Sequence, residues 1–503
     1  PARLELSEPE GGAVFSTESA ASPHLFAETY AETAREPLPT AEPGPGQTPP
    51  ISDSDPAHPP TPRFQPVDPA SLGIDFTHRD FGFEDFRREP LLFHMRSTEG
   101  PALCSGDVDG DGLRDFYIGG AREQGGRLYL QTPDGRFRSV FEPFFEQEAT
   151  SEEVDCAFFD ANGDGYDDLY VVSGGNSLVP ASTALSDRMV LSLPAEDPLL
   201  ASLAAAQPAS VSPVEEDVAV RLYRSPDFQP TSRTFESTSV AAPHDFTGDG
   251  IPDLFVGTRL RPFSVGLPVN GYLLEGDGAG GFRDVTEEWA PALREIGMIT
   301  HAVWTDLNGD GVAEIAIAGE YMPIRVFSPR GGRFEEITER LGLGGTEGWW
   351  NRLVAGDWNA DGRTDLLGLN HGRNSLFRAS QQDPVTLWVG DFSGDGLVEH
   401  ILALRKDGRD YTVALRHDLS AQIPVVGQRF PTYAEFAGKS VQEIFTRQEL
   451  EAALRLQATE LRSMRFMQNP PEPGGVGGGG DAGGAGDAED AKGAGASARS
   501  SAE

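Results

Sequence analysis

Lysine, cysteine and long apolar runs are all scarce in this chain of 503 residues. Only Lys406, Lys439 and Lys492 are lysines, and 79 acidic residues against 40 basic ones give a formal net charge of -39. So negative a chain disfavours nucleic acid and anionic lipid as partners, and it favours cations or surfaces with positive patches. Because no apolar run approaches the ~20 residues of a membrane-spanning helix, we predict no transmembrane segment.

Cys104 and Cys156 are the only cysteines. Each stands in an apolar stretch just before an acidic loop, and we predict two buried thiols rather than a disulfide. One pair cannot form the disulfide framework of a small secreted domain, so the cysteines leave the redox compartment open. The sequence begins at Pro1 without a charged and apolar leader, and we expect that a signal peptide has been removed or that the sequence is a fragment.

Composition divides the chain into three parts. Residues 1–73 are rich in Pro, Ala, Glu and Ser without a sustained apolar period, which predicts a disordered arm. Residues 468–503 are rich in Gly and predict a flexible, disordered tail. The folded body is therefore expected at residues 74–467.

Six acidic loops recur along this body at intervals of roughly 50 residues, each between two short apolar stretches. They are called loops 1 to 6, and they begin at Asp107, Asp160, Asp245, Asp306, Asp357 and Asp391. Around loop 4, the stretches "ITHAVWTD", "EIAIAGE", "PIRVFS" and "RFEEIT" read as four successive strands. We therefore predict an all-β fold, a β-propeller of about six or seven four-stranded blades. The sequence leaves open whether the ring closes with seven blades, closes with six or stays incomplete.

Two stretches of the body depart from this pattern. Residues 177–217 are rich in Ala, Ser and Pro, and we expect an insertion that projects from the blades. Residues 430–465 predict a helical segment packed on the side of the propeller, because apolar residues recur there at helical spacing. These apolar residues are Leu450, Leu454, Ala458 and Leu461.

Each acidic loop offers oxygen-bearing side chains at positions 1, 3, 5 and 9, and the backbone carbonyl of position 7 can add another oxygen. The candidate metal ligands of loops 1 to 3 are Asp107, Asp109, Asp111, Leu113, Asp115, Asp160, Asn162, Asp164, Tyr166, Asp168, Asp245, Thr247, Asp249, Ile251 and Asp253. Those of loops 4 to 6 are Asp306, Asn308, Asp310, Val312, Glu314, Asp357, Asn359, Asp361, Arg363, Asp365, Asp391, Ser393, Asp395, Leu397 and Glu399. Carboxylates that converge in a tight loop repel one another unless a cation lies between them. Hard oxygen ligands without His or Cys favour Ca²⁺, so we predict up to six calcium sites.

Two other interpretations of the loops were weighed. An EF-hand loop needs Glu at position 12 and helical flanks, and neither is present. The residues at position 12 are Ile118, Val171, Val256, Ile317, Gly368 and Leu402. Ordinary hairpin turns would explain one such loop, but not six with the same four oxygen positions. We expect weaker binding in loop 5, where Ala360 replaces Gly, and in loops 3 and 6, which have a hydroxyl at position 3.

The loops and the strands after them, such as "DFYIGG", "DLYVVSGG", "DLFVGT" and "EIAIAGE", resemble the FG-GAP/VCBS repeats of integrin-α-like β-propellers. Longer stretches, including "REPLLFHMRSTEGPALCSGDVDGDGLRDFYIGGA" and "RFPTYAEFAG", look like bacterial VCBS proteins of the cartilage-acidic-protein/UnbV type. This resemblance implies a secreted, cell-surface or outer-envelope propeller with Ca²⁺ in its blade loops and a role in adhesion. It departs after "LRSMRFMQN", where such a protein would begin another blade.

Three functions remain in contention. The first is a non-enzymatic calcium-binding propeller that binds an extracellular protein or glycan. The second is a carbohydrate-active enzyme of the polysaccharide lyase kind, and the third is a purely structural segment of a larger surface protein. The candidate residues for the enzyme are Trp349, Trp350, Asn351, Arg352, Asn370, His371, Arg373 and Asn374. Because paired Trp before a strand is more often core and His371 has no evident acid partner, we expect no enzymatic activity.

Overall fold

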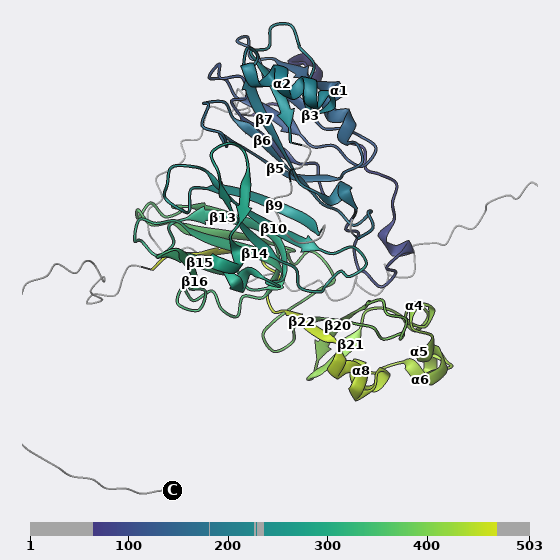
Figure 1. Cartoon of the computed structure of the whole chain (residues 1–503). Helices are drawn as coiled ribbons and strands as arrows, with labels where there is room; N and C mark the ends of the chain where they lie inside the picture. Colours follow the sequence, from purple (N-terminus) through teal and green to yellow (C-terminus); the bar gives the residue numbers. More distant parts are fainter. Residues whose placement is uncertain (1–63, 181, 226–227, 229–235, 470–503) are drawn as a thin grey trace, which may run out of the picture. The chain divides into compact units, whose positions relative to one another are not determined.

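The computed structural model describes residues 64–180, 182–225, 228 and 236–469 (Figure 1). Antiparallel strands dominate this part of the chain, which confirms the all-β class. The helices are short, and none of those described is long and apolar enough to cross a membrane. The predicted disordered ends fall mostly outside the described residues.

The first four groups of strands, here called sheets, each contain four strands in chain order, as expected for propeller blades. The fourth group is also hydrogen-bonded to the fifth, so that these two form one continuous seven-stranded sheet. The first sheet consists of β1 (Leu103–Gly106), β2 (Asp115–Ile118), β3 (Arg127–Gln131) and β4 (Phe137–Val140). The second consists of β5 (Glu153–Phe159), β6 (Asp168–Ser173), β7 (Arg188–Pro194) and β8 (Val220–Arg224). The third consists of β9 (Ser237–His244), β10 (Asp253–Leu260), β11 (Gly271–Gly276) and β12 (Phe282–Asp284). The fourth consists of β13 (Met298–Thr305), β14 (Glu314–Met322), β15 (Arg325–Arg330) and β16 (Arg333–Glu336).

The fifth sheet is interrupted by the sixth. Its strands are β17 (Gly348–Gly356), β18 (Asp365–Asn370) and β23 (Met464–Phe466). The sixth sheet consists of β19 (Val385–Gly390), β20 (Glu399–Lys406), β21 (Arg409–Thr412) and β22 (Leu454–Ala458). Since β23 pairs with β18 across this whole stretch, the sixth sheet is an insertion between the second and third strands of the fifth blade.

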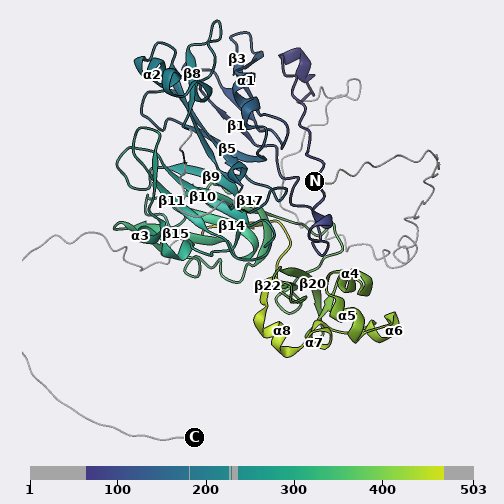
Figure 2. The same ribbon diagram turned by 45° about the vertical axis from the view of Figure 1, so that its right-hand side comes forward.

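Short helices accompany the sixth sheet and the blade edges. Those between β21 and β22 are α4 (Arg416–Gln422), α5 (Pro424–Arg429), α6 (Tyr433–Phe436), α7 (Val441–Ile444) and α8 (Arg447–Ala452). Figure 2 places them together with β20 and β22 at the yellow-green end of the chain. The others are α1 (Glu142–Phe145), α2 (Pro198–Ala206) and α3 (Thr286–Trp289). The helices α4, α5 and α7 bury apolar side chains against β19 and β20.

Neighbouring sheets pack face to face in chain order, and the alternation of side chains along each strand explains how. On β6, Leu169 and Val171 pack toward the first sheet, whereas Tyr170 and Val172 pack toward the third. Every residue of β14 is buried, because sheets cover both of its faces. The continuous apolar run of "EIAIAGE" is therefore the signature of a strand between two sheets.

Two of the expectations for the body need correction. The expected insertion at 177–217 contains β7, a strand of the second sheet, so the extra segment is only the part around α2 between β7 and β8. Helices do occur in the 430–465 segment, but Leu454 and Ala458 lie on β22, which pairs with β19. Residues four apart share a face in a strand as well as in a helix, so their spacing could not separate the two.

Capping explains why this segment forms several short helices rather than one. Capping boxes, in which an N-cap Ser or Thr and a Glu three residues later bond each other's backbone, begin α6, α7 and α8. The pairs are Thr432 with Glu435, Ser440 with Glu443, and Thr446 with Glu449. Each box starts a new helix within eight residues of the last, so no helix grows long.

The boundaries of the folded body also shift. A short 3-10 helix at Pro69–Leu72 precedes the expected start at residue 74, and Tyr129 donates to the Asp75 carboxylate at 2.9 Å. At the other end, the Gln468 amide donates to Asp365 at 2.9 Å. Residues 69–73 and Gln468 therefore belong to the body, not to the arm and the tail.

Candidate metal centres in the acidic loops

All six acidic loops close a hairpin between the first two strands of a sheet, and the register is the same in each. The residue before position 1 pairs with the residue at position 9. These pairs are Gly106 with Asp115, Phe159 with Asp168, His244 with Asp253, Thr305 with Glu314, Gly356 with Asp365, and Gly390 with Glu399. The six predicted ligand sets are therefore presented by equivalent turns.

Positions 4 and 6 adopt left-handed backbone conformations in every loop, which is why Gly dominates there. Loop 5 is the exception, because Ala360 stands at position 4 with a φ of 60°. A side chain at such a φ costs conformational energy. Ala360, which replaces Gly in loop 5, therefore strains the backbone of this loop.

The carboxylates at positions 1 and 5 shape the loops through backbone hydrogen bonds. In loop 2, Asp160 accepts the amides of Gly163 and Gly165 at 2.7 and 2.9 Å. The position 5 carboxylate accepts the position 7 amide in all six loops, as Asp164 does from Tyr166 at 3.0 Å. These bonds turn the side-chain oxygens toward the loop interior while leaving lone pairs on them.

The position 9 carboxylate is buried in every loop. One of its oxygens accepts the amide of position 2 in every loop. In loops 1, 2 and 3 the other oxygen accepts an amide of the third strand, and in loop 5 it accepts the amide of Gln468, just after β23. Asp168, for example, accepts Ala161 at 2.9 Å and Ser192 at 2.8 Å. Position 9 thus ties each of these loops to the interior of its sheet, a structural role that the loop pattern alone did not indicate.

Burial raises the pKa of two of these position 9 carboxyls strongly, to about 7 at Asp115 and about 8 at Asp168. Burial likewise raises the pKa of Asp253, Glu314 and Glu399. Neighbouring carboxylates add to the effect, since Asp109 and Asp111 repel a charge on Asp115. A cation in the loop would counter both causes.

Loop 1 has the arrangement best suited to a cation. Oxygens of Asp107, Asp109 and Asp115 lie within 4.8 Å of one another. Oδ1 of Asp107 and Oδ1 of Asp109 are both buried without a hydrogen-bond partner. A buried carboxylate oxygen without a partner costs folding free energy. A cation such as Ca²⁺, which binds oxygen ligands, would supply the missing partner to both atoms.

The other loops differ in how many carboxylates they bring together. In loop 6, oxygens of Asp391, Asp395 and Glu399 also lie within 4.8 Å of one another. Among the described acidic loops, only loops 1 and 6 gather three carboxylates so closely. In loops 2 and 4, position 3 is Asn, whose amide oxygen accepts the position 5 amide at 2.9 to 3.0 Å.

A known family model matches three spans of this chain, residues 107–171, 245–317 and 306–368, and it describes an FG-GAP-like repeat. The chain contains FG-GAP-like repeats. Each matched span begins at position 1 of one acidic loop and ends at position 12 of another. The matched spans hold loops 1 to 5, whereas loop 6 lies in the sheet inserted into the fifth blade. No curated protein gives a significant match.

Loop 5 carries its own cation. Arg363 at position 7 forms an ion pair with Asp361 at position 5, and its Nε donates to the Gln468 carbonyl at 3.1 Å. Asn359 donates to the same Asp361 carboxylate at 2.7 Å. The Arg363 guanidinium therefore pairs with the carboxylate that a metal would need as a ligand. Arg363 is visible in the sequence, but the prediction considered only the oxygen-bearing positions of the loop.

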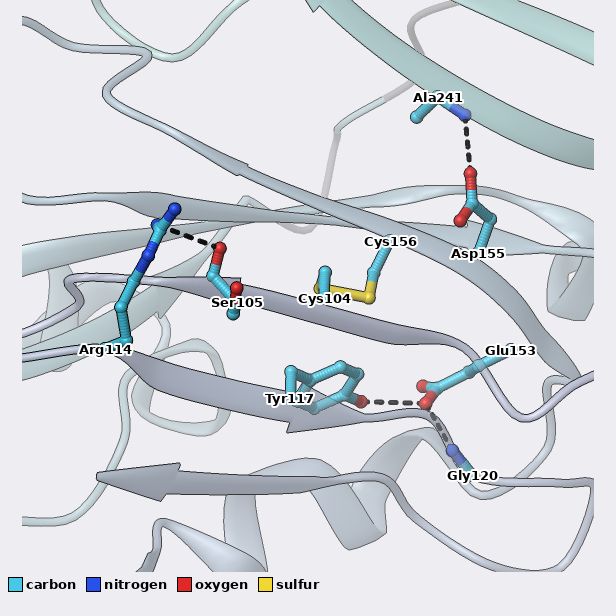
Figure 3. Close-up of a disulfide and its surroundings, with 9 residues drawn as sticks. All are labelled: Cys104, Ser105, Arg114, Tyr117, Gly120, Glu153, Asp155, Cys156 and Ala241. Atoms are coloured by element: carbon cyan, nitrogen blue, oxygen red, sulfur yellow. Dashed lines mark hydrogen bonds between the residues drawn. A yellow bond between two sulfur atoms is a disulfide. The ribbon is translucent and has the colours of Figure 1, made fainter. Parts of the chain in front are cut away.

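A disulfide backs loop 1, and it corrects the prediction of two free thiols. Cys104 on β1 and Cys156 on β5 are bonded, with their Cα atoms 5.7 Å apart (Figure 3). The pairing joins the first and second sheets just before loops 1 and 2. Sequence reasoning could not find it, because both cysteines sit among apolar residues and only the packing of β1 on β5 brings them together.

The residues considered for an enzyme do not form one site. Trp350 is fully buried between the fourth and fifth sheets, and Asn370 donates to the Glu460 carbonyl at 3.0 Å. Trp349, Asn351 and His371 do meet, at a cavity of about 430 Å³ that Phe93 and Arg259 also line. Arg352, Arg373 and Asn374 are exposed and lie outside this lining.

This cavity has an aromatic wall, and it is also lined by the ionisable side chains of His94, Glu99 and Glu320. Phe93 stacks on Trp349 with ring centroids 4.8 Å apart, and His371 contacts Ser375 at 3.0 Å. Burial lowers the pKa of His371, which favours the neutral form of its ring. The cavity is thus suited to holding a polar ligand against an aromatic surface.

Proposed function

We propose that this protein is a calcium-binding, non-enzymatic β-propeller module that acts in an extracellular or cell-surface setting, in adhesion or in binding a protein or glycan. The observation that carries the calcium part is the pair of unpaired, buried carboxylate oxygens of Asp107 and Asp109. Oxygen ligands converging in a flexible loop suit Ca²⁺ better than Mg²⁺, which requires a near-ideal octahedron.

The setting is proposed on two further observations. The disulfide is typical of proteins from oxidising compartments, where such bonds persist. Free Ca²⁺ is abundant enough outside cells to fill weak oxygen sites, which suits loops of modest charge. The partner would be a protein or glycan with basic groups, because the chain is strongly acidic.

Calorimetric titration of the full chain with Ca²⁺ and, separately, Mg²⁺ tests the metal part. We expect several Ca²⁺ per chain, much weaker binding of Mg²⁺, and one site fewer in Asp111→Asn, because position 5 is Asp in all six loops. The matched control is Asp134→Asn, which changes an exposed Asp in the β3–β4 turn outside the acidic loops. Equal Ca²⁺ binding by wild type and Asp111→Asn would remove loop 1 from the proposal, and no binding at all would overturn it.

A binding assay against immobilised matrix proteins and a glycan array tests the adhesive part. We expect a Ca²⁺-dependent signal that leaves the bound glycan uncleaved. Release of shortened or unsaturated sugars would instead favour the carbohydrate-active enzyme.

A further inference from the structure

Two neighbouring glutamates at the start of the second sheet have very different surroundings. Glu153 is 2% exposed and fully partnered (Figure 3). Its carboxylate accepts the Tyr117 hydroxyl, the Gly120 amide and the Arg188 guanidinium, each at 2.7 Å. Glu152 is 1% exposed, and its Oε1 has no hydrogen-bond partner.

Neighbouring negative charges further destabilise the ionised form of Glu152. Its other oxygen accepts only the Arg122 amide, at 3.3 Å. No ion pair of the described residues includes Glu152, and the nearby charges that act on it are the carboxylates of Asp80, Glu153 and Glu99. Burial and these like charges raise the pKa of Glu152 to about 7. A buried carboxyl in this position lacks a cationic partner.

The N-terminal segment brings two metal-binding side chains to the same place. His78, Asp80 and Glu152 each present one ligand atom within 4.8 Å of the others. The Nδ1 atom of His78 is buried without a partner, while Nε2 lies 3.2 Å from Asp80. His78 Nδ1 and Glu152 Oε1 are thus two buried atoms of one cluster that have no hydrogen-bond partner.

The backbone on both sides of His78 is hydrogen-bonded to the loop between β2 and β3 of the first sheet. Gln124 accepts the Arg79 amide at 2.8 Å and donates to the Thr77 carbonyl at 2.9 Å. On the other side, the Gly174 amide donates to the Glu152 carbonyl at 2.9 Å. The ligand atoms are therefore carried by two anchored segments rather than by a free chain end.

We propose that His78, Asp80 and Glu152 form a binding site for a first-row divalent transition metal ion, with Zn²⁺ the best match. One imidazole and two carboxylates are ligands of such ions, whereas Ca²⁺ takes oxygen ligands alone. Three protein ligands leave a coordination position for water, on the side where Asp80 is 55% exposed. The ion would fasten the segment before the first sheet to the start of the second.

Titration of the full chain with Co²⁺ in excess Ca²⁺ tests this site separately from the acidic loops. The Co²⁺ ion reports ligation by imidazole through its visible absorption, and added Zn²⁺ should bleach that absorption by displacement. We expect one Co²⁺ per chain in the wild type. Glu152→Gln and His78→Gln should each weaken its binding by at least ~10-fold, since even partners outside the first shell cost that much.

Asp80→Asn is the third ligand variant, and it should also weaken Co²⁺ binding, because its exposed side chain can change without disturbing the fold. The matched control is His417→Gln, since His417 also lies beside a carboxylate, 3.1 Å from Asp418, but without a third ligand. It should bind Co²⁺ as the wild type does. Absence of Co²⁺ and Zn²⁺ uptake by the wild type, or equal uptake by all three ligand variants, would overturn the site. Neither outcome bears on calcium in the acidic loops.

Discussion

Loops 1 and 5 share one spacing of oxygen-bearing side chains but differ in what neutralises their carboxylates. In loop 1, Asp107 and Asp109 have buried oxygens without partners, and the loop is joined to the second sheet. The Asp107 amide donates to Asp167 at 2.8 Å, and the disulfide lies three residues earlier in the chain. In loop 5, Arg363 already pairs with Asp361.

The difference teaches that the repeat fixes where oxygens stand, while neighbouring residues decide whether they are free. Position 7 was considered only for its carbonyl, yet its side chain is Leu in loops 1 and 6 and Arg in loop 5. The Arg363 guanidinium brings a positive charge to the loop 5 carboxylates, whereas the Arg114 guanidinium of loop 1 donates to the Ser105 carbonyl instead. We therefore expect calcium at loop 1 and little or none at loop 5.

The largest effect should come from removing the disulfide that backs loop 1. A Cys104→Ala/Cys156→Ala variant should lose ~2–4 kcal/mol of unfolding free energy, because a bond that closes a loop of this length constrains the unfolded chain. Urea unfolding in saturating Ca²⁺ measures this loss. Reductant should destabilise the wild type but leave the variant unaffected, and an unchanged midpoint in the variant would contradict a structural role.

A smaller loss should follow from Asp111→Asn in loop 1. At a Ca²⁺ concentration ~100 times the dissociation constant, one site contributes ~2.7 kcal/mol to stability. The variant should lose up to that amount in Ca²⁺ and almost nothing in chelator. The same change at the equivalent position of loop 5, Asp361→Asn, should leave the Ca²⁺-dependent part of Tm nearly intact. Equal losses from the two variants would erase the contrast between the loops.

Calcium stabilisation should also depend on pH, through the buried position 9 carboxyls of loops 1 and 2. The pKa of Asp115 is raised to about 7 and that of Asp168 to about 8, above the unfolded value, so the metal-free folded state holds protons that the unfolded state has lost. Metal-free stability should therefore fall as pH rises from about 4 to about 8. Ca²⁺ must displace these protons, so chelation should lower Tm more at pH 8.5 than at pH 6. A chelator effect of equal size at both pH values would contradict this linkage.

Sequence periodicity predicted the loops, the hairpins and the four-stranded sheets, because these depend on local turns and alternation. It failed where distant segments meet. The third strand of the fifth blade, β23, arrives after the whole sixth sheet, and no local pattern marks Met464–Phe466 as its continuation. The disulfide depends on β1 packing against β5, and the cluster at Glu152 depends on a segment that composition placed at the edge of a disordered arm.

The sequence likewise predicted some features of the candidate sites and missed others. The ligand positions follow from the Asp, Asn and Gly pattern, but the role of position 9 as a buried anchor requires the third strand. Asp167, which holds the loop 1 backbone, stands at position 8 of loop 2 and was not considered. Arg363 at position 7 of loop 5 was visible in the sequence. Its positive charge alone would have predicted weaker cation binding in that loop.

The smallest and most specific effect should be a gain of binding at loop 5. Arg363→Leu places there the residue that loops 1 and 6 have at position 7, and it frees the Asp361 carboxylate. Because Ala360 keeps its unfavourable φ, the new site should be weak and contribute ~1.4 kcal/mol at a Ca²⁺ concentration ~10 times its dissociation constant. Calorimetry should count one more Ca²⁺ than in the wild type, and adding Ala360→Gly should tighten it. An unchanged count in the double variant would mean that the ion pair is not what keeps loop 5 empty.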